Sequence, residues 1–139
     1  MIETYKGFVD ARGEIRDLLR DVKLDSVTLI HTKKGAIRGN HYHAKTWQWT
    51  YIVSGCLRIV TKEVMPDRVA SRRPGDMTAG AQRSADAPAA TLLVDPPYQA
   101  HAWQALEDAT VLVFTSGPRS GPGYESDVIR LTGEERLIV

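Results

Sequence analysis

Two histidines separated by one residue, His41 and His43, are the part of the sequence best suited to chemistry, and Gln48 follows five residues later. Successive side chains of a β-strand point to opposite faces, so both histidines share a face if this segment is a strand. Two imidazoles held in this way can bind one metal ion. The simpler interpretation is a pair of polar residues on the half-exposed side of a strand, without a ligand.

Turn residues frame this pair of histidines. Gly35 precedes them, Gly39-Asn40 lies directly before His41, and Ser54-Gly55 follows residues 49–53, which have the composition of a buried strand. A tight connection between two such strands places Gln48 beside the histidines. The framing therefore favours a functional cluster.

Length and cysteine usage favour one self-sufficient domain spanning residues 1–139. A chain of 139 residues buries about two thirds of its unfolded surface and needs no disulfides, and Cys56 is the only cysteine. The start lacks a basic segment followed by an apolar run, and no stretch approaches the roughly 20 apolar residues of a membrane span. We expect a cytoplasmic protein that does not interact with membranes.

The charge distribution argues against a nucleic-acid partner. Eighteen basic and 17 acidic residues give a net charge of +1, and the densest basic cluster is only Arg68, Arg72 and Arg73. Nucleic-acid-binding proteins usually carry a basic stripe. Scattered arginines suit a small anion such as a diphosphate instead.

Short β-type runs separated by turn residues dominate the chain, which predicts an all-β sandwich or barrel. The predicted strands are Thr4–Val9, Glu14–Leu19, Ser26–Thr32, Ala36–His43, Trp47–Val53, Leu57–Val64, Thr91–Val94, Ala100–Leu106 and Thr110–Thr115. Residues 66–90 are predicted to form a long flap or an extra sheet edge. Residues 116–123 form a second predicted loop, which leads into an extended segment that continues to the C-terminus.

A third histidine, His101, follows a Pro96-Pro97 turn at the start of another predicted strand. In a barrel, this strand can face the first pair of histidines across the interior. His41, His43, Gln48 and His101 then form a set of four metal ligands.

These spacings resemble those of the cupin superfamily. Its first motif, G-x5-H-x-H-x4-E-x6-G, matches at Gly35, His41, His43 and Gly55, with Gln48 in place of the glutamate. Its second motif matches at Pro96 and His101, whereas Ala90, Tyr98 and Ala105 replace the two glycines and the asparagine. The resemblance covers about residues 26–115 and implies a single-domain jelly-roll barrel.

Within the cupins, the sequence is most similar to the sugar-nucleotide branch. Residues 39–43, Gly-Asn-His-Tyr-His, resemble the metal-binding cupin domain of capsular-polysaccharide sugar-nucleotide epimerases, and Arg38-Gly39 resembles the Arg-Gly run of deoxysugar 3,4-ketoisomerases and 3,5-epimerases. Residues 109–116 and 124–130 are similar to the ketoisomerase C-terminal region. The resemblance implies a nucleotide sugar as substrate, with Arg38 binding its anionic group.

Gln48 changes the chemistry of the expected metal site. A glutamine carbonyl is neutral, so a bound ion keeps its full 2+ charge and is a stronger Lewis acid that is held less tightly. Imidazole ligands suit Zn, Ni, Fe or Cu, and the sequence does not choose among them. Gln48 alternatively contacts the substrate or a ligating histidine.

Strand alternation assigns faces to the residues after Gln48. If Gln48 points inward, Thr50 and Ile52 do as well, and an aromatic stripe formed by Trp47, Trp49 and Tyr51 covers the opposite face. An apolar stripe of this size predicts a homodimer. The opposite orientation places the tryptophans in the pocket and turns Gln48 away from the ion. Trp103 shares a face with His101 and is expected to line the cavity, as a substrate-binding or a core residue.

The resemblance implies a reaction on a nucleotide-linked 4-keto-deoxysugar. Removal of the proton beside the carbonyl gives an enediolate that a metal stabilises, and the returned proton yields either an epimer or a keto isomer. In the absence of metal, His41 and His43 are the acid–base candidates, with Tyr124 as a further acid. Arg38 lies on the wrong face unless Gly39 creates a bulge. A mononuclear iron dioxygenase and a non-catalytic metal-binding or ligand-binding cupin are the alternatives.

Overall fold

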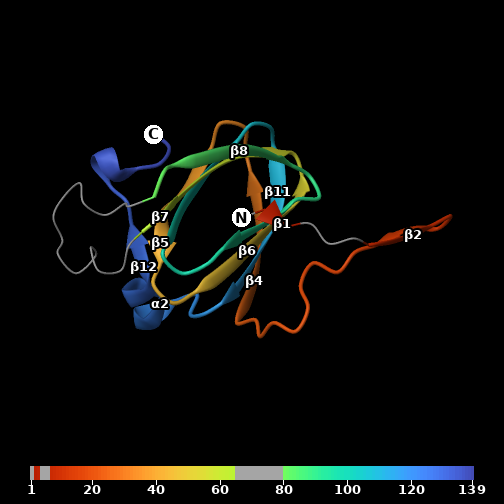
Figure 1. Cartoon of the computed structure of the whole chain (residues 1–139), viewed down its shortest axis with the longest axis horizontal. Helices are drawn as coiled ribbons and strands as arrows, with labels where there is room; N and C mark the ends of the chain where they lie inside the picture. Colours follow the sequence, from red (N-terminus) through yellow and green to blue (C-terminus); the bar gives the residue numbers. More distant parts are fainter. Residues whose placement is uncertain (1, 4–6, 65–79) are drawn as a thin grey trace.

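The computed structural model describes residues 2–3, 7–64 and 80–139, and it consists mainly of two five-stranded antiparallel sheets that face each other (Figure 1). The first sheet has the strand order β1-β9-β6-β11-β4 and the second has the order β12-β5-β10-β7-β8. The strands are β1 (Ile2–Glu3), β4 (Ser26–Thr32), β5 (Ile37–His43), β6 (Trp47–Ser54), β7 (Cys56–Glu63), β8 (Arg83–Pro88), β9 (Leu92–Asp95), β10 (Gln99–Ala105), β11 (Ala109–Ser116) and β12 (Val128–Arg130).

The chain passes repeatedly from one sheet to the other, from β4 to β5, from β5 to β6 and from β6 to β7. Most strands of the two sheets therefore pair with strands that do not follow them directly in the sequence, as in a jelly roll. The expected all-β jelly-roll barrel is confirmed.

The main core lies between the two sheets and follows the alternation of the strands. On β6, Thr50 and Ile52 are buried, whereas Trp47 lies on the other face and is 45% exposed. Ile52 packs with Trp103 of the opposite sheet and with Val111 of β11. The inward orientation expected for Gln48, Thr50 and Ile52 is thus the one observed.

The outer face of the second sheet is covered by the C-terminal residues. Tyr42 and Ala102 on this face form a second apolar cluster with Leu131 and Leu137. Asn40 fastens this covering segment, because its side-chain oxygen accepts bonds from the Leu137 and Ile138 N–H groups at 2.8 and 3.2 Å. Its side-chain nitrogen donates to the Ile138 carbonyl at 2.9 Å.

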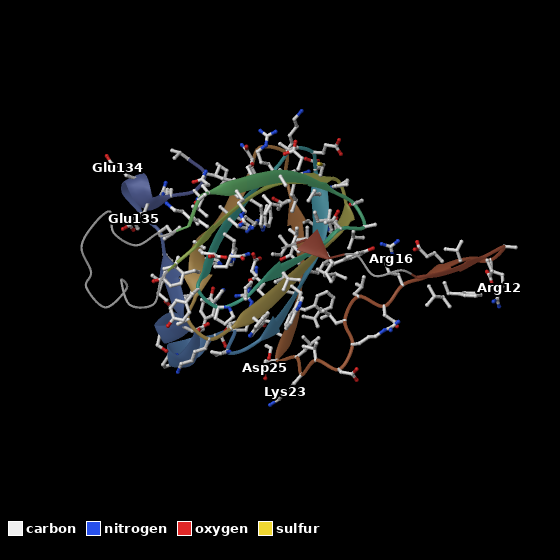
Figure 2. All side chains as sticks on the ribbon, viewed as in Figure 1. Arg12, Arg16, Lys23, Asp25, Glu134 and Glu135 are labelled. Atoms are coloured by element: carbon white, nitrogen blue, oxygen red, sulfur yellow. The ribbon has the colours of Figure 1, made fainter. Side chains whose placement is uncertain are left out.

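A short hairpin, formed by β2 (Phe8–Asp10) and β3 (Gly13–Ile15), extends away from the barrel (Figure 1). Two side-chain interactions stabilise it locally. Arg12 at the tip pairs with Asp10 at 2.5 Å, and Arg16 near the barrel pairs with Glu14 at 2.6 Å (Figure 2).

Three elements can be compared with the sequence-based expectation, and two of them differ from it. The strand predicted for Glu14–Leu19 ends at Ile15. Within residues 66–90, Arg83–Pro88 form the edge strand β8, which is the extra edge considered for this region, whereas residues 65–79 lie outside the described part. The prediction of an extended C-terminal segment is wrong in detail, because the helix α2 (Gly121–Asp127) precedes β12 and a 3-10 turn η1 (Gly133–Glu135) follows it.

The strand expected at Thr4–Val9 falls partly outside the described residues, and β2 begins at Phe8. Within the described ranges, no helix has the length and apolar character that crossing a membrane requires.

Candidate active site

A β-bulge in β5 organises the candidate site. His41 pairs with His101 on β10 and Gly39 pairs with Ala102, so two steps along β5 correspond to one step along β10. The extra residue fits because Gly39 and Asn40 both have positive φ, 87° and 54°. A Cβ on Gly39 would lie 2.8 Å from the His101 carbonyl oxygen, so this position is suited to glycine.

The bulge shifts the alternation of side chains along β5. With simple alternation, Arg38 and His41 lie on opposite faces of the strand. The sequence therefore predicted Arg38 in the site only if Gly39 creates a bulge. The bulge is present, and Arg38 lines the same cavity as His41.

This cavity has a volume of about 170 Å³ and lies at one end of the barrel interior. Five strands, the β5–β6 connection and the segment after β11 supply its walls. The lining residues are Ile30, Arg38, Gly39, His41, His43, Thr46, Gln48, His101, Trp103, Val113, Thr115, Pro118, Arg119 and Tyr124.

The three predicted histidines come together in the cavity. One ring nitrogen from each of His41, His43 and His101 lies within 4.8 Å of the other two. The ring centroid of His41 is 5.0 Å from that of His43 and 4.7 Å from that of His101. Gln48 lies beside them, with its Nε2 at 3.4 Å from His101 Nε2.

Hydrogen bonds from Nδ1 orient two of the three histidine rings. His43 Nδ1–H donates to Asp127 Oδ2 at 3.0 Å, and His101 Nδ1–H donates to the Gln99 carbonyl at 3.2 Å. These bonds fix the tautomers, so that the Nε2 atoms of both rings are the basic nitrogens. His41 Nε2 is buried and has no hydrogen-bond partner among the described residues.

Burial determines the charge of the histidines. Desolvation, followed by repulsion from His101 and His43, lowers the pKa of His41 to about 2. Desolvation also lowers the pKa of His43, although its bond to Asp127 opposes this effect. Both rings are therefore neutral at pH 7 and retain a lone pair.

Asp127 is a component of the site that the sequence did not assign. Burial acts to raise its pKa, but the Thr46 hydroxyl, the Lys45 N–H group and His43 together hold the pKa below its ordinary value. The Lys45 N–H group donates to its Oδ1 at 2.6 Å. Asp127 is thus a buried carboxylate directed at His43, on a segment that the sequence predicted as extended.

A second unassigned carboxylate, Asp95, stands beside His101. It is 7% exposed, accepts a bond from Gln99 Nε2 at 3.0 Å and lies 3.8 Å from His101 Nδ1. Asp95 pairs with Gln48 in the ladder between β9 and β6. Its place at the end of a buried apolar strand was the only sequence signal for it.

The segment from β11 to α2 closes one side of the cavity with two further candidate residues. The Tyr124 ring lies 6.3 Å from the His43 ring, and the Arg119 guanidinium lies 5.5 Å from the centre of the Tyr124 ring. Trp103, which is 6% exposed, lines the cavity and also belongs to the main core.

The donor set fits a divalent metal ion. His43 and His101 present Nε2 while their Nδ1 atoms are engaged, and His41 Nε2 is a buried polar atom without a partner. Metal-ligating histidines typically donate their second N–H to a carboxylate or carbonyl in this way.

The fold is the jelly-roll barrel of the cupin class, with three histidines grouped in its interior. The chain belongs to the polysaccharide biosynthesis C-terminal domain family, whose pattern matches residues 8–80. Comparison with curated proteins gives no match.

Solved structures of sugar-nucleotide enzymes share this fold. The dTDP-4-dehydrorhamnose 3,5-epimerase from Sulfolobus tokodaii is 22% identical, with a TM-score of 0.69 over 96% of this chain and 81% of that chain. A 3,4-ketoisomerase from Helicobacter canadensis is 18% identical, with a TM-score of 0.70 over 94% and 89% of the two chains. A histidine-to-asparagine variant of a 3,4-ketoisomerase from Thermoanaerobacterium thermosaccharolyticum, in complex with TDP-4-keto-6-deoxyglucose, is 20% identical, with a TM-score of 0.66 over 94% and 86%.

Proposed function

We propose that the protein is an epimerase or ketoisomerase acting on a nucleotide-linked 4-keto-deoxysugar. The observation that carries this proposal is the buried His43–Asp127 pair, 3.0 Å apart, whose imidazole faces a cavity that also contains arginine and tyrosine side chains. The similarity of the fold to enzymes named as acting on such sugars supports the same reaction class.

In the metal-free site, His43 is the catalytic base. Its Nε2 takes the proton from the carbon beside the sugar carbonyl, and the electron pair moves to the carbonyl oxygen to give an enediolate. Asp127 is a positioning residue that holds the ring by Nδ1–H and stabilises the imidazolium. The other acid–base candidates are Tyr124 and His41, which burial keeps neutral. They exchange protons on the opposite face of the same sugar carbon or at the neighbouring carbon.

The choice between epimer and isomer follows from where the proton returns. Return to the opposite face of the same carbon inverts that carbon. Return to the adjacent carbon moves the carbonyl by one position. In both cases substrate and product have the same composition, so no redox partner is needed.

We also propose a divalent metal, Zn, Ni or Fe, held by His41, His43 and His101, with Gln48 as the fourth candidate ligand. Such an ion, when bound, supplies a Lewis acid for a developing oxyanion. Metal occupancy determines the role of His43, because its Nε2 cannot hold a metal and take a proton together. When the metal is bound by the histidines, Tyr124 is the acid–base candidate that is still free to transfer a proton.

Residues at the rim and wall of the cavity bind the substrate in this proposal. Arg38 and Arg119 are exposed and line the cavity, so they are placed to bind the diphosphate, which guanidinium groups recognise well. Trp103 supplies an apolar wall for the sugar. We further propose a homodimer, in which the aromatic stripe of Trp47, Trp49 and Tyr51 is covered.

The experiment is incubation with TDP-4-keto-6-deoxyglucose in D₂O, with NMR detection of deuterium incorporation beside the carbonyl. We expect exchange and a new sugar product, and we expect His43→Asn to abolish both. His31→Asn is the matched control, because His31 is exposed, is not among the residues that line the cavity, and contacts the Thr110 hydroxyl through its Nδ1. Asp127→Asn should slow exchange at least tenfold, whereas Asp86→Asn, at an exposed ion pair, should not.

Metal analysis completes the test. Iron content with oxygen consumption and no nucleotide binding would replace the proposal with the dioxygenase alternative. Binding of the nucleotide sugar without exchange in either the metal-loaded or the chelated protein would identify a ligand-binding module.

A further inference from the structure

The ligand set proposed for the metal carries no negative charge of its own. The three histidines bind a metal as neutral imidazoles, and the position that the cupin motif fills with glutamate holds Gln48 here. A buried charge is costly unless an opposite charge compensates it. One buried carboxylate, that of Asp127, lies 3.0 Å from His43. Balancing a 2+ ion calls for a second carboxylate close to the ligands.

Asp95 provides a carboxylate directly beside Gln48. In the ladder between β9 and β6, Asp95 pairs with Gln48. The next pair on the same face, Leu93 with Thr50, is buried inside the barrel. Because alternate residues of a strand share a face, Asp95 and Gln48 also point into the interior. Residues directly opposite each other in this way have Cβ atoms about 5 Å apart. The carboxylate thus lies one strand away from the motif's glutamate position.

Two contacts direct this carboxylate at His101. Its Oδ1 lies 3.8 Å from His101 Nδ1 and accepts a bond from Gln99 Nε2 at 3.0 Å. The Gln99 carbonyl in turn accepts the bond from His101 Nδ1–H at 3.2 Å. Asp95 therefore holds Gln99, whose carbonyl fixes the His101 ring. Asp95 is 7% exposed, and within the described ranges no lysine or arginine pairs with it. Its negative charge is thus directed at the histidine cluster.

The charge of Asp95 also acts on a second histidine of the cluster. Desolvation lowers the pKa of His43, and the bond to Asp127 and the negative charge of Asp95 oppose this effect. A carboxylate that favours positive charge on an imidazole also favours a cation bound by that imidazole. Asp127 at His43 and Asp95 at His101 are therefore two negative charges on the two sides of one ligand set.

We infer that Asp95 is a positioning residue for the metal site and supplies, through His101, the negative charge that Gln48 does not. This inference rests on the metal in the proposed function. It goes beyond that proposal because it assigns the role of the motif's glutamate to a residue on the neighbouring strand. The arrangement compensates the charge of a bound ion while Gln48, a neutral and weaker ligand, stays in the ligand set.

The test uses Asp95→Asn and Gln48→Glu, alone and combined, in Zn²⁺ titrations against a chromophoric chelator. The Asp95→Asn variant keeps an oxygen for the Gln99 bond and loses only the charge. Its dissociation constant for Zn²⁺ should rise about 10–100-fold, the usual cost of losing such a partner. Asp86→Asn, at an exposed ion pair, is the matched control and should leave the constant unchanged. Circular dichroism checks the fold of each variant.

The combined variant separates this role from a purely structural one. Gln48→Glu in the Asp95→Asn background returns the charge to the motif's usual position, so Zn²⁺ affinity should recover to within about threefold of the unmodified protein. In the unmodified background, the same change places two carboxylates directly opposite each other. It should then raise the affinity by less than about threefold, because the charge is already compensated and like charges opposite each other repel.

Four results overturn the inference. An unchanged dissociation constant in Asp95→Asn is the first. A Gln48→Glu effect of equal size in both backgrounds is the second, since a residue that only fixes Gln99 would give this result. If Asp95→Asn does not fold, Gln48→Glu alone decides, because an affinity gain of about tenfold or more would mean that Asp95 had not supplied the charge.

The fourth result is an unmodified protein that binds no Zn²⁺, which would refute the proposed metal and this inference together. The proposed reaction is decided separately by deuterium exchange. A protein that exchanges no deuterium but shows the expected Zn²⁺ affinities would refute the reaction and leave the role of Asp95 supported.

Discussion

Replacement of Asn40 by alanine should remove the bonds that hold the C-terminal segment on the barrel. Three hydrogen bonds of 2.8–3.2 Å join its amide to Leu137 and Ile138, and each contributes about 0.5–1.5 kcal/mol. Asn40 also has a φ of 54°, a conformation that costs alanine roughly 1 kcal/mol more than asparagine or glycine. We therefore expect Asn40→Ala to lower the free energy of unfolding by about 3–4 kcal/mol.

Two further substitutions at Asn40 separate these contributions, with urea unfolding monitored by tryptophan fluorescence as the assay. Asn40→Gly tolerates the positive φ but loses all three bonds, so it should exceed Asn40→Ala in stability by about 1 kcal/mol. Asn40→Asp keeps an oxygen for the Leu137 and Ile138 N–H groups and should lose the least. The reasoning is refuted if the alanine, glycine and aspartate variants all unfold within 0.5 kcal/mol of the unmodified protein.

Three further predictions concern the histidine cluster and the bulge. Gly39→Ala should cost about 2–3 kcal/mol in urea unfolding, against about 1 kcal/mol for Gly35→Ala, because Gly35 has a similar φ of 86° but an added Cβ there would have no atom within 4 Å. Equal losses would mean that the contact with the His101 carbonyl does not constrain the bulge. His101→Ala should abolish metal binding by plasma emission analysis while His31→Ala retains it, and full occupancy after loss of His101 would exclude the proposed ligand set. In chelated protein, the pKa of His41 is about 2 in the folded state and 6.5 in the unfolded chain. The unfolded state therefore binds a proton at a higher pH than the folded state does. The free energy of unfolding should be constant above about pH 6.5 and should fall by about 1 kcal/mol per pH unit below it. The His41→Asn variant should show a flatter dependence, and an unchanged slope would contradict the burial argument.

Side-chain spacing was sufficient to predict that the three histidines meet inside the barrel. The alternation that joins His41 to His43 and the turn before His101 are local properties of strands, and these properties hold in the fold. The same alternation identified the inward face of β6. Even the bulge had a local signal, since a Gly39-Asn40 pair tolerates positive φ at two consecutive positions.

What the sequence did not reveal depends on tertiary contacts. The strand β8, Arg-Ser-Ala-Asp-Ala-Pro, has little intrinsic β-propensity and forms because it pairs with β7 along Cys56–Thr61. The helix α2 contains two glycines and a proline, a composition that indicates a loop. Asp127 could not be assigned to His43 without knowing that this helix returns to the barrel. The cytoplasmic location and the single-domain organisation stay predictions.

The segment between β11 and β12 has a consequence for how such a site can diversify. The metal-binding candidates come from the paired strands, but Arg119, Tyr124 and Asp127 lie within nine consecutive residues of one connection. Because a connection tolerates changes in length and sequence more readily than a paired strand, this single cassette can be exchanged as a unit. A graft of residues 117–127 would replace the proposed proton donor, the proposed anion-binding arginine and the carboxylate that bonds His43 in one step, with the histidine-bearing strands unchanged.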